Sequence, residues 1–142
     1  MCGVIAALVS GALMSIQGVF NTDLTKQTSL WVSASFVQFT ALFACLIAWQ
    51  ICDRTSFRSI LEVSDKYILL GGIIGAFITA TVILGTKSLG PARAAMLIVI
   101  AQITIAWLIE LAGVFGMEKQ EFSMRKLIGL LIAAAGVITF EL

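Results

Sequence analysis

The chain has 142 residues, of which 60% are hydrophobic and 12% are charged, and its formal net charge is +1. Its 9 basic and 8 acidic side chains are too few to cover the apolar surface of a soluble domain, in which about 25% of residues are charged. The composition therefore excludes a soluble globular protein and a disordered chain, and the lack of a basic excess excludes a nucleic-acid-binding protein. A lipid bilayer suits this composition, and the length predicts a single membrane domain, 1–142, with a few spans.

The gaps between charged residues predict five membrane-spanning helices. A helix needs about 20 residues to cross about 30 Å of hydrocarbon, and only hydrogen bonds within the segment can satisfy its backbone there, which excludes open strands. The first three gaps reach this length directly. The fourth reaches it if Glu110 is included near its end, and the fifth if Arg125 and Lys126 snorkel toward the headgroups. The predicted spans are 2–21, 30–52, 67–86, 92–115 and 124–140.

The first predicted span carries polar side chains on one face. Ser10, Gln17 and Asn21 are separated by seven and four residues, a spacing that aligns them along a helix. The segment lacks the basic start and the cleavage site of a signal peptide, so we expect it to remain in the mature protein as a span.

The second predicted span lies between two tryptophans. Trp31 and Trp49 are 18 residues apart, or about 27 Å along a helix, which is the spacing of two interfacial aromatic belts. The segment that follows, 53–66, holds six of the charged residues. Its apolar and charged side chains fall on opposite sides of a helix, so it is either a short amphipathic helix on the membrane surface or an ordinary polar loop.

Small residues line one face of several predicted spans. The third span contains the sequence GGIIGA, in which Gly71 and Gly75 are four residues apart, and such rows let helix backbones approach closely. The fifth span has Gly129, Ala133 and Gly136 on one face, with no amide or charged side chain in its apolar run. We therefore expect the third span to pack closely against a neighbour, and the fifth to pack and dimerise rather than line a cavity.

Side-chain amides inside the hydrocarbon are the candidate functional residues, because polar groups there are costly. The predicted substrate-binding residues are Gln17, Asn21, Gln38 and Gln102, although the same spacing fits hydrogen bonds that only join helices. Glu110 is the one acid within an apolar run. It is a candidate for proton coupling, or alternatively an interfacial residue that ends its span. We expect Gln17, Asn21 and Gln102 to face a common cavity with Glu110 at its rim.

The residues of classical catalytic and metal sites are missing from the sequence. There is no histidine, the commonest general base and metal ligand, and the three cysteines have no metal-binding spacing. Cys2, Cys45 and Cys52 are therefore interpreted as small apolar residues rather than as a disulfide framework. We expect no enzyme activity, no cofactor and no metal site.

The basic residues of the loops predict the orientation of the chain. Five spans place the termini on opposite faces of the membrane, and positively charged loops favour the cytoplasm. The loops on the N-terminal side contain six basic residues and the others contain three, which favours a cytoplasmic N-terminus and leaves insertion in both orientations open. The first group is Arg54, Arg58, Lys66, Lys119, Arg125 and Lys126, and the second is Lys26, Lys87 and Arg93.

A set of short motifs runs in order along nearly the whole chain. They are Gln17 with Asn21, Ser35-Phe36, GGIIGA from Gly71, Ala101-Gln102, IELAGVFG from Ile109, and Arg125 followed by Gly129 and Gly136. In the order and spacing of these motifs, the chain resembles the YdcZ-like family, half-size members of the drug/metabolite transporter superfamily. It departs from that family at Glu110-Leu111, where an Asp-His pair is usual, so that the carboxylate is kept and the imidazole is lost.

The resemblance implies an all-α integral membrane protein equal to half of a ten-helix transporter built from two inverted repeats. Its expected function is secondary transport, as an exporter of a small metabolite or drug-like solute in the inner membrane, by alternating access in an antiparallel dimer. The expected partners are membrane lipid, the solute, and a second copy or a related five-helix chain in the opposite orientation. The alternative is a non-transporting membrane scaffold or assembly subunit, which would gain nothing from four amides in its spans.

Overall fold

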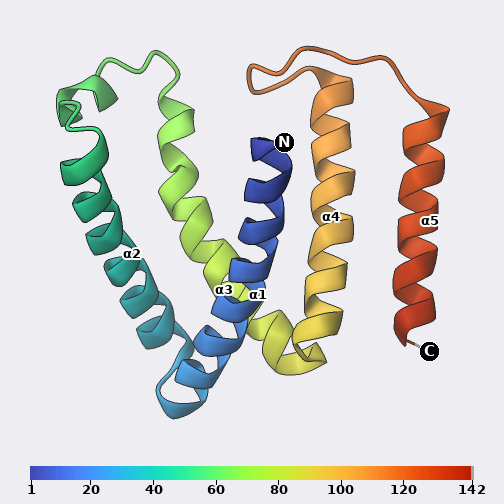
Figure 1. Ribbon diagram of the computed structural model, residues 1–142, viewed down its shortest axis with the longest axis horizontal. Coiled ribbons are helices and arrows are strands. Elements are labelled where there is room, and N and C mark those ends of the chain that lie inside the picture. The colour runs from blue at the N-terminus through green and yellow to red at the C-terminus, as the bar shows by residue number, and fades with distance from the viewer. Residues whose placement is uncertain (142) are drawn as a thin grey trace. The chain divides into compact units, whose positions relative to one another are not determined.

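The computed structural model describes residues 1–141, and those residues form helices and connecting turns only (Figure 1). The five α-helices are α1 (Cys2–Gln27), α2 (Leu30–Cys52), α3 (Gly71–Leu89), α4 (Pro91–Ala112) and α5 (Met124–Glu141). Two short 3₁₀ helices, Phe57–Ile60 and Lys66–Leu70, precede α3. The predicted all-α fold with five helices is confirmed.

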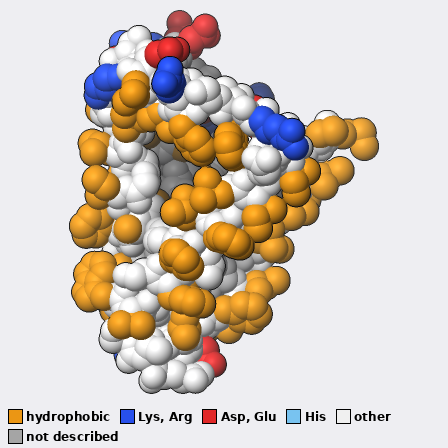
Figure 2. Space-filling view, turned by 90° about the vertical axis from the view of Figure 1, so that its left-hand side faces the viewer, with side chains coloured by type: hydrophobic (Ala, Val, Ile, Leu, Met, Phe, Trp, Pro, Cys, Tyr) orange, Lys and Arg blue, Asp and Glu red, His pale blue; other side chains and the backbone are white. Residues whose placement is uncertain are grey.

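Four helical segments within residues 1–141 are long and apolar enough to cross a membrane, judged by length and composition. They are Cys2–Gln27, Leu30–Cys52, Lys66–Leu89 and Pro91–Ala112. In Figure 2, hydrophobic side chains cover the middle of the visible face and charged side chains lie toward its ends. α5 has 18 residues and begins with Met124-Arg125-Lys126, so its apolar part is shorter. As a fifth span it still depends on those two cations reaching the headgroups.

Two helix ends differ from the predicted span ends. α1 continues to Gln27, six residues past the predicted end at 21, because charge excludes a residue from hydrocarbon but not from a helix. α4 ends at Ala112, three residues before the predicted end at 115. Gly113 adopts a left-handed φ of +64°, and a Cβ there would lie 2.7 Å from the Cβ of Lys119, so only glycine fits this turn.

The charged segment 53–66 is a loop with one turn of 3₁₀ helix, Phe57–Ile60, and not a continuous amphipathic α-helix. Trp49, near the end of α2, holds this loop. Its Nε1 donates a hydrogen bond to the carbonyl of Thr55 at 2.9 Å, and its ring centroid lies 4.8 Å from that of Phe57. Of the two alternatives for this segment, the polar loop is the one that forms.

The chain divides into two compact units, Met1–Lys87 and Ser88–Leu142. In the first unit, α1 and α2 form a hairpin whose second helix starts at the N-cap Ser29, and they diverge from this turn in Figure 1. Residues 1–17, which are Met1 and the first 16 residues of α1, are all exposed. The buried residues of the three helices gather at the end of the unit that contains the turn. They are Gly18, Asn21, Thr22, Thr25, Ser33, Ala34, Ala80, Ile83 and Thr86.

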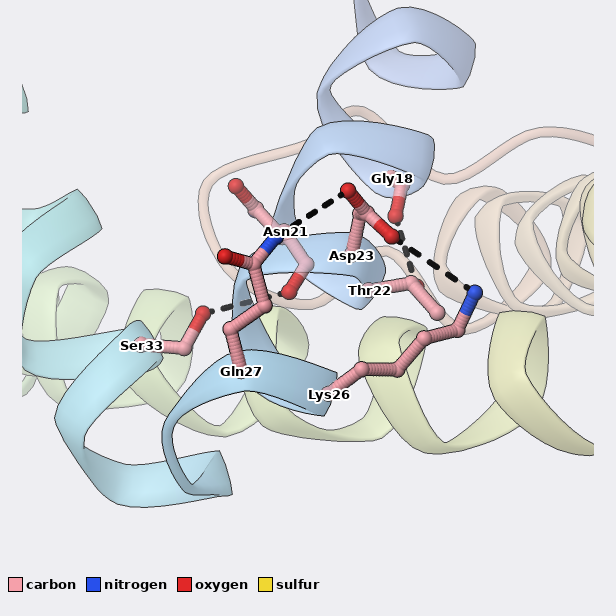
Figure 3. A network of polar contacts seen from close by, with 7 residues as sticks. All are labelled: Gly18, Asn21, Thr22, Asp23, Lys26, Gln27 and Ser33. Atoms are coloured by element: carbon pink, nitrogen blue, oxygen red, sulfur yellow. Dashed lines mark hydrogen bonds and ion pairs between the residues drawn. The ribbon is translucent and has the colours of Figure 1, made fainter.

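The buried end of this unit is more polar than apolar. Ser33 Oγ donates a hydrogen bond to the carbonyl of Asn21 at 3.2 Å and joins α2 to α1, while Thr22 Oγ1 bonds the carbonyl of Gly18 at 2.7 Å (Figure 3). A Cβ at Gly18 would lie 3.6 Å from Val82 Cγ1, so α1 also passes close to α3. Polar contacts and close approach are what hold helices together in lipid, where apolar burial between helices gives no advantage.

The GGIIGA sequence at the start of α3 does not form the expected packing face within this unit. A Cβ at Gly71 or Gly72 would meet no atom within 4 Å. Only at Gly75 would it approach a neighbour, Gln38 Nε2 at 3.8 Å. The buried residues of α3 lie instead in its C-terminal half, because the helices of this unit converge toward the α1–α2 turn.

In the second unit, α4 and α5 run side by side and are joined by residues 113–123 (Figure 1). This loop folds back on the end of α4, where the backbone N–H of Gln120 donates to the carbonyl of Glu110 at 2.8 Å. The ring centroids of Trp107 and Phe122 lie 5.6 Å apart. These contacts fix the loop to α4 and thereby position the start of α5.

Candidate functional site

A groove of about 400 Å³ lies between α4 and α5, a volume within the range of about 300–1,000 Å³ that small-molecule sites occupy. Its walls are mostly apolar, and it holds one acid and one base. No group of three or more His, Cys, Asp or Glu that could hold a metal ion occurs among the side chains of residues 1–140. The groove is lined by Ile103, Ala106, Trp107 and Glu110 of α4 and by Lys126, Gly129, Leu130 and Ala133 of α5.

The acid and the base of this groove are paired. Lys126 Nζ lies 2.6 Å from Glu110 Oε2 and also donates a hydrogen bond to Gln120 Oε1 at 2.7 Å. Both charged side chains are partly exposed, 30% for Glu110 and 44% for Lys126. Because the first turn of a helix disfavours a cation, the carboxylate also offsets the unfavourable position of Lys126 at the start of α5. This charge-assisted contact joins the two helices at one end of the groove.

Trp107 supplies the aromatic wall of the groove. It comes three residues before Glu110, which places both side chains on one face of α4. Its Nε1 is buried and has no hydrogen-bond partner within residues 1–141, although an indole N–H usually finds an acceptor when it is buried. The contact with Phe122 therefore positions the ring by packing rather than by a hydrogen bond.

The expectation that the fifth span does not line a cavity is wrong. Gly129, Leu130 and Ala133 of α5 form one side of the groove, and a Cβ added at Gly129 would meet no atom within 4 Å. Small residues bring two helices together only if the opposite helix leaves room at the same level. Here the bulky Ile103 and Trp107 face them from α4, so the small residues of α5 leave an open groove.

A second, open groove runs along one face of α1. It is lined by Ser10, Gln17 and Asn21 together with apolar neighbours from α1 itself. The predicted alignment of these three polar residues on one face is confirmed. Asn21 is buried and Gln17 is exposed, so the polar face continues from the buried end of the unit into the unpacked half of α1. A role of Gln17 and Asn21 in substrate binding stays a prediction.

Gln38 and Gln102 lie in different surroundings from the amides of α1. Gln38 Nε2 donates a hydrogen bond to Thr79 Oγ1 at 3.4 Å and so joins α2 to α3. This contact matches the alternative in which an amide holds helices together. Gln102 lies on α4 in the second unit, where it is exposed. Its expected place in a common cavity with Gln17 stays a prediction.

The sequence predicts Glu110 as a candidate, but its partners Lys126 and Trp107 are not among the predicted site residues. The spacing of Trp107 and Glu110 is a usable signal, because residues three apart share a helix face. The pairing of Glu110 with Lys126, 16 residues later, leaves no such signal. It depends on how the loop 113–123 folds back on α4.

The family match covers nearly the whole chain. A family model described as "Putative inner membrane exporter, YdcZ" matches residues 2–139. No curated protein and no solved structure matches the chain. The matched range includes all of α1 to α4 and most of α5. The chain therefore belongs to the YdcZ family.

Proposed function

We propose that this protein is a secondary transporter that exports a small drug-like or metabolite solute across the inner membrane. The groove between α4 and α5 carries this proposal. A scaffold subunit, which is the alternative, holds its helices together by close packing and has no use for a groove of about 400 Å³ with a charged pair at one end. The description of the family as an exporter supports the same conclusion.

The exposed half of α1 supports a transporter made of two chains. Residues 1–17 are all exposed, and the groove with Ser10 and Gln17 has walls from α1 alone. Polar side chains avoid lipid, so a second chain that covers this face would enclose the amides in a shared interior. Five spans from each of two oppositely oriented chains would give the ten helices and the inverted symmetry of full-length transporters.

Either a second copy or a related five-helix chain suits this arrangement. The loops carry six basic residues on one side and three on the other, which favours a cytoplasmic N-terminus for this chain. A related chain whose basic loop residues favour the opposite orientation would complete the pair directly. A second copy would do so if part of the protein inserts in the other orientation.

The Glu110–Lys126 pair is the proposed coupling element. Protonation of Glu110 removes its charge and weakens the 2.6 Å contact that joins α4 to α5. Loss of this contact would open the groove toward one side of the membrane, and its return would close it, as alternating access requires. Gln17, Asn21, Gln38 and Gln102 are proposed to contact the solute along its path.

A flux screen in proteoliposomes tests the proposal. Purified protein is reconstituted, and a panel of neutral, anionic and cationic organic solutes is assayed with and without an imposed proton gradient. We expect the gradient to drive at least one solute faster than in protein-free liposomes. Folded, inserted protein that moves no solute of the panel would contradict transport and favour the scaffold.

A further inference from the structure

We propose that the α4–α5 groove binds a lipophilic organic cation, which takes the place of Lys126 beside Glu110. The inference rests on the proposed function, because it names the class of solute that the transporter carries. Three properties of the groove support it. They are a carboxylate and an aromatic ring on one helix face, a resident cation that can leave, and apolar walls with open space.

Glu110 and Trp107 together recognise a positive charge. Both line the groove, and their spacing of three residues places them on one face of α4. The carboxylate attracts a cation by its charge, and the face of an indole attracts it by the quadrupole of the ring, more strongly where water is excluded. Phe122, with its ring centroid 5.6 Å from that of Trp107, packs against the indole from outside the groove and holds it in place.

Lys126 occupies the position that a solute cation would take, with its Nζ 2.6 Å from Glu110 Oε2. The two partners differ in their freedom to leave. The lysine ammonium ends a flexible four-carbon stem that can swing toward the headgroups, whereas the glutamate carboxylate is held close to α4 by a shorter stem. A solute cation can therefore displace Lys126 toward water. A solute anion would have to leave the Glu110 charge uncompensated in the groove.

The walls of the groove favour an apolar cation over a small hydrated one. Ile103, Ala106, Leu130 and Ala133 present only carbon side chains to it. Space is left beside Gly129, where a Cβ would meet no atom within 4 Å. A metal ion needs several oxygen ligands, and the groove offers a single carboxylate. A quaternary phosphonium or ammonium with aromatic or alkyl groups suits both the charge and the walls.

Tetraphenylphosphonium and tetraphenylborate test the inference, because they share their shape and differ in the sign of their charge. Binding to purified protein in lipid nanodiscs is measured by equilibrium dialysis against empty nanodiscs. We expect saturable binding of the phosphonium and none of the borate. Lys126→Met removes the resident cation, keeps an apolar stem, and should tighten phosphonium binding about tenfold. Glu110→Gln should weaken it about tenfold or more.

Arg125→Met is the matched control. Arg125 precedes Lys126 in the first turn of α5 but is not among the residues that line the groove. Its loss removes the same charge from the surface without changing the neighbours of Glu110, so phosphonium affinity should stay within about twofold. Equally tighter phosphonium binding in Arg125→Met and Lys126→Met would overturn the inference. So would saturable borate binding, a lack of phosphonium binding, or unchanged affinity after Glu110→Gln.

Binding and flux together separate this inference from the proposed function. Phosphonium that binds as expected, while the gradient moves neither phosphonium nor any panel solute across proteoliposomes, supports the inference and contradicts transport. A panel solute that the gradient moves, while phosphonium does not bind, supports transport and overturns the inference. Circular dichroism establishes that each variant is folded. If Lys126→Met does not fold, Lys126→Gln replaces it, and if Glu110→Gln does not fold, Glu110→Ala replaces it.

Discussion

Thr25 and Ser33 show how single polar atoms act at the buried end of the first unit. Ser33 is 0% exposed, and its hydroxyl joins α2 to the carbonyl of Asn21. The Oγ1 of Thr25 is also buried but has no hydrogen-bond partner within residues 1–141. A buried hydroxyl that is paired contributes to stability, whereas an unpaired one lowers it. The two side chains should therefore act on stability with opposite sign.

Removal of each hydroxyl tests this difference. Thr25→Val keeps the shape of the side chain, so the free energy of unfolding should stay constant or rise by about 1 kcal/mol. Ser33→Ala removes the bond to Asn21 and should lower that free energy by about 1 kcal/mol. Denaturant unfolding in detergent micelles, followed by circular dichroism, measures both. A larger loss for Thr25→Val than for Ser33→Ala would mean that Thr25 is paired in the folded protein.

The charge of Glu110 is expected to be needed for coupling rather than for folding. Glu110→Gln keeps size and polarity but cannot release a proton, so pH-driven flux should disappear. Stability should fall by less than about 1 kcal/mol, because both members of the pair with Lys126 are partly exposed. Flux with and without a proton gradient, together with thermal unfolding, measures both effects. An unchanged pH dependence would favour the alternative of an interfacial residue.

At the level of whole helices, α3 and α5 both carry rows of small residues. Gly71 and Gly72 of α3 are open on the side where a neighbour was expected, and Gly129 of α5 borders a groove. A row of small residues permits a close approach, but the side chains of the opposite helix decide whether the approach takes place. In α5 the opposite helix is bulky, and the row becomes a wall of the candidate site.

Gly129→Leu should fill the groove without disturbing the fold. A Cβ there meets no atom within 4 Å, and leucine favours a helix over glycine by up to about 1 kcal/mol, so the free energy of unfolding should not fall. Solute binding should weaken about tenfold, because the groove loses volume. Gly136→Leu is the control, since Gly136 is equally open but does not line the groove. An equal loss of solute binding in Gly129→Leu and Gly136→Leu would indicate that α5 affects binding through assembly. Assembly is the role that the small-residue face of α5 predicts from the sequence.

The helices themselves are largely predictable from the gaps between charges. α2 has its predicted bounds, Leu30–Cys52, because Ser29 caps its start and Asp53 follows its end, and both features are local. Periodicity within one helix likewise places Gln17 and Asn21 on one face. These features are predictable because they depend on residues within a turn or two of one another.

The contacts between helices are not predictable in the same way. The end of α4 at Ala112 depends on Gly113, which turns the chain toward Lys119. The pairing of Glu110 with Lys126 needs that turn and the folded loop after it. The glycine is a local signal for the end of a helix, but the charge gap runs past it and sets the predicted end too late. The pairing leaves no pattern in the sequence, because it depends on the three-dimensional path of the loop 113–123.

At the scale of the whole molecule, the described part of the chain buries little apolar surface. Its buried hydrophobic residues are Ala34, Ala80, Ile83 and Ala94. A bilayer covers apolar side chains that face lipid, but it does not suit the polar face of α1. We therefore expect the functional molecule to contain a second chain against that face.

Cross-links between two chains test the antiparallel arrangement. Ser59 follows α2 and Lys87 lies near the end of α3, so the predicted topology puts them on opposite sides of the membrane. Single cysteines at these positions are introduced into protein from which Cys2, Cys45 and Cys52 have been removed. We expect Ser59→Cys of one chain to cross-link to Lys87→Cys of another. Cross-links that join only identical positions would indicate a parallel pair.

Both units contain a helical hairpin that is held by contacts between residues close in sequence. Ser33 bonds Asn21, 12 residues away, and Lys126 pairs with Glu110, 16 residues away. Short loops close early in folding, because little entropy is lost in joining their ends. During synthesis, the α1–α2 hairpin can therefore close before the α4–α5 hairpin has left the ribosome. We therefore expect the two hairpins to enter the membrane in separate steps, so that a variant that delays one leaves the insertion of the other intact.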